Sequence, residues 1–242
     1  MYENSKFVKA LREYFFHPSW RCNDCGIEIF EDEYFCEDCK SKLPYNNKKI
    51  CKHCGRKVEV SCEYCSTCKG RLTQVDLARS VFVYERPINS LIKQAKYENK
   101  IYLIELFAKY MAPIYFKSYI NADCLCFVPM TDKSLNDRGY NQSQILAQKL
   151  SEIIQVPVID CLIKTKDTTR QAKLDRAGSM KNLQGVFKVN NKSAVNGKTV
   201  LIIDDVATTG ATSENIAKAL KDAGAERVCL LTVASVPSKE GY

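Results

Sequence analysis

Two adjacent aspartates in front of a turn rich in threonine give this sequence its clearest potential for chemistry. The apolar run Val200–Ile203 is followed by Asp204 and Asp205, and then by the segment 206–212, which reads VATTGAT. A turn of Thr, Gly and Ala at the start of a helix offers backbone N–H groups, hydroxyls and the positive end of a helix dipole to one phosphate. The two carboxylates would repel a phosphate, but they suit the hydroxyls of a vicinal diol or a Mg²⁺ ion. A ribose 5-phosphate has both features, and we expect this segment to bind one.

The cysteines form a second chemical pattern. Nine of the thirteen lie between Cys22 and Cys68, and eight of these nine form four CxxC pairs. The first two pairs are ten residues apart, and the whole arrangement recurs at an offset of 29 residues with seven identities. Two CxxC pairs at this separation can present four thiolates to one Zn²⁺ in a tetrahedron, so the sequence predicts two zinc ribbons. The predicted ligands are Cys22, Cys25, Cys36 and Cys39 in the first ribbon and Cys51, Cys54, Cys65 and Cys68 in the second.

The ninth cysteine of this region, Cys62, aligns with Glu33 of the first copy and is predicted not to bind zinc. A set with Cys62 in place of Cys68 stays open. Zinc is favoured over disulfides because no export signal is visible, and each ribbon is so short that the metal must supply its folding energy. The segment Met1–Asp76 has 13 basic and 12 acidic residues, so its charge does not decide whether the ribbons are structural or also bind nucleic acid.

The overall composition is that of a globular protein. The chain has 242 residues, of which 26% are charged and 45% hydrophobic, and its formal charge is +8. Eight thiolates and two Zn²⁺ ions would lower that charge to about +4, which permits phosphate or nucleic-acid ligands without indicating either. No apolar run approaches the roughly 18 residues of a membrane helix, and charges interrupt Met1–Trp20 as a signal peptide. We expect a cytoplasmic protein without membrane insertion.

The chain from about Leu77 onward alternates between strand and helix patterns. This alternation predicts an α/β fold, a parallel sheet flanked by helices, in which ligands bind at the carboxyl ends of the strands. Strands are expected at Val81–Tyr84, Cys124–Val128, Val156–Ile159, Thr199–Ile203 and Val228–Ala234, and helices at Tyr102–Phe116, Asn141–Ile154 and up to Leu220. The expected domains are an amphipathic helix in 1–20, a double zinc ribbon in 21–76 and the α/β domain in 77–242.

Longer motifs point to a family. The run Val200–Thr212 resembles the 13-residue phosphoribosyl pyrophosphate (PRPP) motif of type I phosphoribosyltransferases. Together with the paired CxxC motifs, Val128-Pro129, the RGYNQ segment 138–142 and Arg170-Gln171, it makes nearly the whole chain similar to the ComF competence protein family. Members of this family consist of a zinc-finger segment and a phosphoribosyltransferase domain, and they are associated with natural transformation, the uptake of single-stranded DNA.

This resemblance implies ligands and roles for individual residues. It implies that Asp204 and Asp205 bind the ribose hydroxyls of PRPP, directly or through Mg²⁺, and that the turn after them holds the 5′-phosphate. The implied PRPP-binding residues are Asp204, Asp205, Ala207, Thr208, Thr209, Gly210, Ala211 and Thr212. The implied pyrophosphate loop contains Met130, Thr131, Asp132 and Lys133, assisted by Arg138.

The basic segment Thr165–Lys181 has few apolar anchors, which is typical of a lid that closes over a polyanion. The candidates for catalysis are Arg170, Lys173 and Arg176. Some relatives have an acid where Thr208 stands, so no general base is visible here. Three functions stay open: a Mg²⁺-dependent phosphoribosyltransferase with an unidentified nitrogenous acceptor, a DNA-uptake accessory protein that binds single strands or other competence proteins, and a PRPP-binding regulator.

Overall fold

We describe the protein from a computed structural model. The structure describes residues 21–29, 34–70, 73–98, 100–166, 183 and 185–238. The helix expected in 1–20 and the catalytic candidates Arg170, Lys173 and Arg176 lie outside these residues. The chain divides into two compact units, Met1–Leu43 and Pro44–Tyr242. The first ribbon therefore belongs to one unit, while the second ribbon shares a unit with the sheet. The predicted boundaries at residues 20 and 76 stay predictions.

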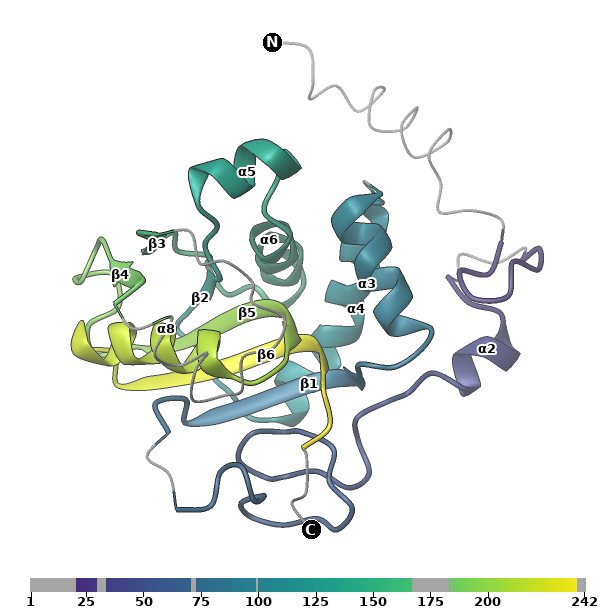
Figure 1. Cartoon of the computed structure of the whole chain (residues 1–242), viewed down its shortest axis with the longest axis horizontal. Helices are drawn as coiled ribbons and strands as arrows, with labels where there is room; N and C mark the ends of the chain where they lie inside the picture. The colour runs from purple at the N-terminus through teal and green to yellow at the C-terminus, as the bar shows by residue number, and fades with distance from the viewer. Residues whose placement is uncertain are drawn as a thin grey trace. The chain divides into compact units, whose positions relative to one another are not determined.

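Four parallel strands form the central sheet of the larger unit (Figure 1). In spatial order they are β1 (Leu77–Val83), β6 (Arg227–Ser235), β5 (Thr199–Ala207) and β2 (Cys124–Phe127). The two middle strands, β6 and β5, are nearly continuous runs of buried apolar residues as far as Ile203 in β5. Such runs are typical of strands that helices cover on both faces.

The helices cover the two faces with different partners. On one face, Ile216 and Leu220 of α8 (Ala211–Asp222) share a core with alternate strand residues such as Ile202 and Leu230. On the other, α4 (Tyr102–Lys117) and α6 (Gln142–Ile154) pack on each other and on the four strands. The remaining helices are α2 (Glu37–Ser41), α3 (Ile88–Tyr97) and α5 (Asp132–Arg138). The α/β fold class expected from the sequence is confirmed.

A few elements differ from the expectation. The segment Val156–Ile159 makes only an isolated parallel bridge, between Leu125 and Val158, because Pro157 has no N–H with which to extend the ladder. Two short antiparallel strands, β3 (Leu162–Lys164) and β4 (Phe187–Val189), were not expected. The strand β5 extends to Ala207. Asp204 and Asp205 are therefore residues of the strand itself and do not follow its end.

Candidate functional site

The acidic pair lies at the carboxyl end of β5, where two helices reach it. The Ser143 hydroxyl of α6 donates a hydrogen bond to Asp204 Oδ1 at 2.9 Å, and the Asp205 backbone N–H donates to the same oxygen at 2.9 Å. Lys96, in the last turn of α3, forms an ion pair with Asp205. The Lys96 side chain is only 14% exposed and the Asp205 side chain only 15%. The two carboxylates are thus held by α3, α6 and their own strand.

Burial gives Asp204 unusual electrostatics. Its removal from water, and then the neighbouring charge of Asp205, raise the pKa of Asp204 to about 7, although Lys96 and the hydrogen bond from Ser143 act in the opposite direction. A carboxyl group whose pKa is shifted by burial and by a neighbouring carboxylate is typical of a binding or catalytic site. The arrangement suits a ligand that brings hydroxyl donors or a cation.

The raised pKa of Asp204 predicts how the stability of the fold depends on pH. The folded-state pKa of Asp204 lies above its ordinary value of 3.8, so the stability provided by the neutral carboxyl is present below pH 4 and is lost as the pH rises through about 7. Asp204→Asn is neutral at every pH, and it should raise the melting temperature of the ligand-free protein by about 2–4 °C for each kcal/mol of charge-burial cost and repulsion that it removes. The gain should be larger at pH 8 than at pH 5.

Thermal unfolding followed by circular dichroism at the two pH values checks this result. Asp137→Asn, at an exposed position of α5, is the control and should change neither melting temperature. A variant Asp204→Asn that melts lower than the wild type at pH 8 would show that the carboxylate stabilises the fold.

The turn after the acidic pair leaves backbone donors unused. Gly210 caps α8 in the left-handed conformation at φ 81°, and no side chain caps this helix. Ala211 N–H contacts Thr209 Oγ1 at 3.3 Å, and Glu214 N–H donates to Gly210 O at 3.0 Å. Within the part of the chain that the structure describes, the N–H groups of Gly210, Thr212 and Ser213 donate to no other group. These amides and the helix dipole form a cup that suits one phosphate.

The predicted pyrophosphate loop is partly helical. It follows β2, but Thr131 already caps α5, accepting a hydrogen bond from Ser134 N–H at 3.3 Å, so Asp132 and Lys133 are the first helical residues rather than loop residues. Arg138 lies in the last turn of α5, where its guanidinium donates to Gln142 Oε1 at 2.9 Å. The position of these residues is settled by the fold, while their role toward pyrophosphate stays a prediction.

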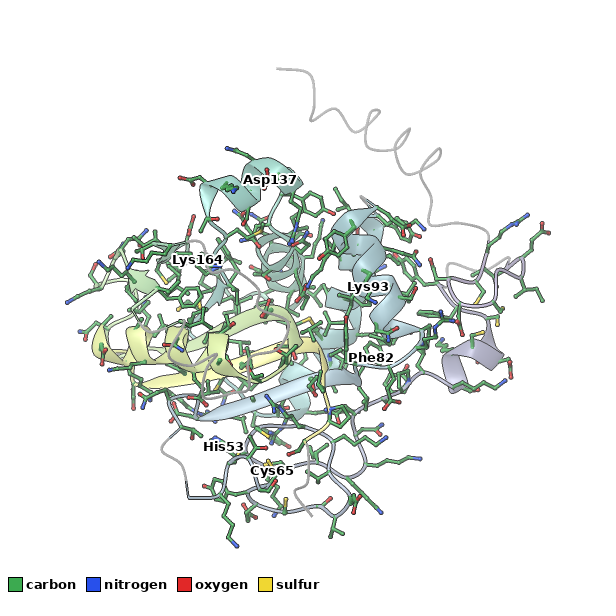
Figure 2. The ribbon with its side chains drawn as sticks, viewed as in Figure 1. His53, Cys65, Phe82, Lys93, Asp137 and Lys164 are labelled. Atoms are coloured by element: carbon green, nitrogen blue, oxygen red, sulfur yellow. The ribbon has the colours of Figure 1, made fainter. Side chains whose placement is uncertain are left out.

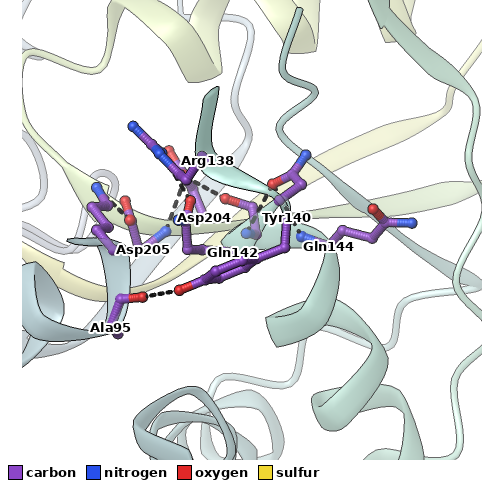
Figure 3. A network of polar contacts seen from close by, with 10 residues as sticks. Ala95, Arg138, Tyr140, Gln142, Gln144, Asp204 and Asp205 are labelled. Atoms are coloured by element: carbon purple, nitrogen blue, oxygen red, sulfur yellow. Dashed lines mark hydrogen bonds and ion pairs between the residues drawn. The ribbon is translucent and has the colours of Figure 1, made fainter. Parts of the chain in front are cut away.

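Arg138 belongs to a polar network that also reaches the acidic pair (Figure 3). Its guanidinium lies 5.5 Å from the centre of the Tyr97 ring, at the end of α3. The Tyr140 hydroxyl donates to Ala95 O in the same helix, and Gln142 and Ser143 begin α6. The end of α3 therefore contacts both the acidic pair, through Lys96, and the Arg138 segment. The sequence placed Lys96 in a motif shared with the ComF family but gave neither Lys96 nor Ser143 a role in the site, because no local pattern connects them with residues far along the chain.

The eight predicted zinc ligands gather in two groups of four. In each group the sulfur atoms all lie within 4.8 Å of one another, and the second group contains Cys68 rather than Cys62. The Cys25–Cys36 and Cys54–Cys65 sulfur distances are both 3.8 Å, which is about the edge of a tetrahedron with Zn–S bonds of about 2.3 Å. Both groups therefore fit Zn²⁺, whose binding would supply the folding energy of each ribbon.

The two copies also share a backbone pattern. In the first ribbon (residues 22–39), Cys22 N–H donates to Ile27 O at 2.8 Å, and in the second (residues 51–68), Cys51 N–H donates to Arg56 O at 3.0 Å. A bridge between residues 21 and 28 is likewise matched by one between 50 and 57, at the same offset of 29. The internal repeat in the sequence is a structural repeat.

Comparison with known proteins agrees with both parts of the chain. Residues 135–241 match the family of phosphoribosyl transferase domains, and residues 13–69 match the double zinc ribbon domain. Competence protein F of Haemophilus influenzae is 27% identical over 221 residues, which are 87% of this chain and 94% of the relative. The chain is similar to proteins of the ComF family over most of its length. The resemblance found in the sequence is thereby confirmed.

Two other relatives have names that refer to competence and to DNA utilization. Competence protein ComFC of Bacillus subtilis is 28% identical over 199 residues, 80% of each chain. DNA utilization protein YhgH of Escherichia coli is 27% identical over 203 residues, 80% of this chain and 86% of the relative.

Among the residues that the structure describes, no helix has the length and apolar character to span a bilayer.

Proposed function

We propose that this protein binds PRPP with Mg²⁺ at the carboxyl end of β5. The observation that carries the proposal is the unbonded amide cup at the start of α8, directly after two carboxylates. The cup suits the 5′-phosphate, and Asp204 and Asp205 suit the ribose hydroxyls or a Mg²⁺ ion bound by them. Thr208, Thr209 and Thr212 add hydroxyl donors around the phosphate.

The charges near the cup support a polyphosphate rather than a simple sugar phosphate. Arg138 and Lys96 lie in the network around the acidic pair, and Lys133 lies in the first turn of α5. Cations in a largely dehydrated site stabilise a pyrophosphate group and the charge that develops on it when it leaves. We assign the role of pyrophosphate binding to the segment Met130–Lys133 with Arg138.

The direct test is calorimetry of PRPP binding to the whole protein in the presence and absence of Mg²⁺. We expect one site per chain, a requirement for Mg²⁺, and a higher melting temperature with ligand, because a ligand that binds only the native state stabilises it. No heat of binding together with an unchanged melting temperature would overturn the proposal.

We further propose that bound PRPP is turned over by a nitrogenous acceptor. In this reaction the acceptor nitrogen forms a bond to the anomeric carbon, the bond from that carbon to pyrophosphate breaks, and pyrophosphate leaves with its electron pair. Thr208 is exposed and offers no basic group, so the acceptor must not require a base at that position. Release of pyrophosphate with a panel of nucleobases tests turnover. Binding without release would favour a PRPP-sensing regulator.

Single-stranded DNA is a second proposed ligand, supported by the name of one relative, DNA utilization protein YhgH, and by exposed lysines on and beside the second ribbon. These lysines are Lys48, Lys49, Lys57 and Lys69. We expect the affinity for a thymidine oligonucleotide to fall steeply with salt. Replacement of two of these lysines by glutamate should reduce the slope of log affinity against log salt concentration by about two released counterions. An unchanged slope would exclude this ribbon as the DNA-binding surface.

A further inference from the structure

The second ribbon covers the free edge of the sheet within its own compact unit. Among the described residues, no named strand pairs with the outer edge of β1, which makes only an isolated antiparallel bridge between Tyr45 and Phe82. Instead, Ala78 N–H donates to His53 O at 2.9 Å, and Asn46 N–H, from the segment just before the ribbon, donates to Val81 O at 2.8 Å. Figure 2 shows His53 and Cys65 of this ribbon beside the strand. The ribbon and the segment just before it thus satisfy backbone groups that an exposed edge strand would leave open.

The same ribbon also faces the back of the phosphate cup. A small pocket is lined on one side by ribbon residues and on the other by residues of the cup and the first turn of α8. The ribbon side contains His53, Cys54, Arg56 and Cys68, and the cup side Ala207, Gly210, Ser213 and Glu214. Ser213 and Glu214 are each only 8% exposed. Two zinc ligands therefore line the same pocket as the glycine that caps α8.

A chain of hydrogen bonds connects the ribbon to the last residue of β5. Ser238 N–H donates to Lys57 O at 3.0 Å, and the Ser238 hydroxyl lies 3.2 Å from Thr67 Oγ1. Two residues earlier, Val236 N–H donates to Ala207 O at 3.0 Å. Ala207 directly precedes the cup, so the segment after β6 ties the cup to the ribbon.

A third connection holds the start of α8. The Gln74 N–H group, in the segment between the ribbon and β1, donates to Glu214 Oε2 at 2.6 Å. The first turn of a helix is the part with the fewest hydrogen bonds of its own, so its order depends on such outside contacts. The cup is thus supported from behind by the ribbon, by the segment after it and by the segment after β6.

We propose that the second zinc ribbon positions the phosphate cup, so that a folded ribbon 51–68 sets the order of residues 208–214 and the affinity of the cup for its ligand. The effect on affinity rests on the proposed PRPP site, whereas the effect on the order of residues 208–214 does not. If the cup is ordered for only part of the time, the apparent dissociation constant rises in proportion. The first ribbon belongs to the other compact unit.

The repeat provides a matched pair of variants. Gly26 and Gly55 occupy equivalent places in the two ribbons and have similar positive φ angles, 75° and 67°. An alanine Cβ at position 55 would lie 2.4 Å from Ala78 O, in the edge strand, whereas at position 26 it would meet no atom of the described residues within 4 Å. Gly55→Ala and Gly26→Ala therefore strain their own turns alike, but only Gly55→Ala pushes its ribbon away from the sheet.

The experiment measures hydrogen exchange of the amides in 208–214 and the affinity for PRPP with Mg²⁺ in the full-length protein. Gly55→Ala should speed exchange in this segment and weaken binding about tenfold, while Gly26→Ala changes neither. Wild-type exchange and affinity in Gly55→Ala, or equal effects of both variants, would overturn the inference. If the wild type does not bind PRPP, the proposed function fails, but the exchange comparison still decides the positioning role.

A second variant keeps the test available if Gly55→Ala does not fold. Ser238→Pro removes both the N–H group that bonds to Lys57 O and the hydroxyl beside Thr67 Oγ1, and it replaces no cysteine and no residue of the sheet. It should act in the same direction with a smaller loss of affinity, about threefold. Exchange in 208–214 that equals that of the wild type would contradict the role of this connection.

Discussion

Replacing both aspartates of the acidic pair with alanine should weaken the binding of PRPP with Mg²⁺ by about a hundredfold or more. Each carboxylate is expected to accept hydrogen bonds from a ribose hydroxyl or to hold the metal ion, and a hydrogen bond to a charged group contributes about 1.5–3 kcal/mol. The site is largely buried, so water replaces the lost contacts poorly. Calorimetry with the variant Asp204→Ala/Asp205→Ala measures the loss.

The control for this experiment changes the net charge equally. Asp137→Ala/Asp160→Ala removes two exposed carboxylates outside the acidic pair and should leave the affinity within about twofold of the wild type. A hundredfold loss in both double variants would mean that overall charge, rather than contact with the ligand, controls binding. Wild-type affinity in Asp204→Ala/Asp205→Ala would show that the acidic pair does not bind the ligand.

Loss of zinc from the second ribbon should destabilise the larger unit far more than the same change does in the first ribbon. Cys51→Ser/Cys54→Ser and Cys22→Ser/Cys25→Ser remove equivalent ligands, and each should lower the zinc content from two ions per chain to one. Cys51 is fully buried, and its sulfur accepts a hydrogen bond from Cys65 N–H at 3.2 Å. Unfolding of this ribbon exposes the edge of β1.

We expect the melting temperature of the sheet to fall by about 10 °C or more in Cys51→Ser/Cys54→Ser, since zinc supplies roughly 10–16 kcal/mol to isolated zinc-finger peptides and each kcal/mol shifts melting by about 2–4 °C. Calorimetric unfolding with zinc analysis checks both double variants. Equal shifts in the two would show that the second ribbon gives the sheet no special support.

Local patterns made part of this structure predictable. The four CxxC pairs and the 29-residue repeat are short-range features, and they predicted which eight thiols the structure gathers. The phosphate cup is also local, because the acidic pair, the turn and the helix follow one another directly in the sequence. In both cases neighbours in the chain are neighbours in the site.

Contacts between distant segments were not predictable in the same way. Lys96 and Ser143 reach the acidic pair from helices that precede it by 109 and 61 residues, so their roles depend on the packing of α3 and α6. The helix α5 has no buried residue and therefore no apolar periodicity to indicate it. The strands β3 and β4 have only three residues each, too few for an alternating pattern.

The equivalent glycines of the two ribbons have a consequence for how this sequence can vary. At position 26 the requirement is conformational alone, and asparagine or aspartate, which tolerate a left-handed backbone, can replace glycine. At position 55 the adjoining strand also excludes any side chain, so glycine has no substitute. The two equivalent turns therefore tolerate substitution unequally, and only the turn of the first ribbon has room for a side chain.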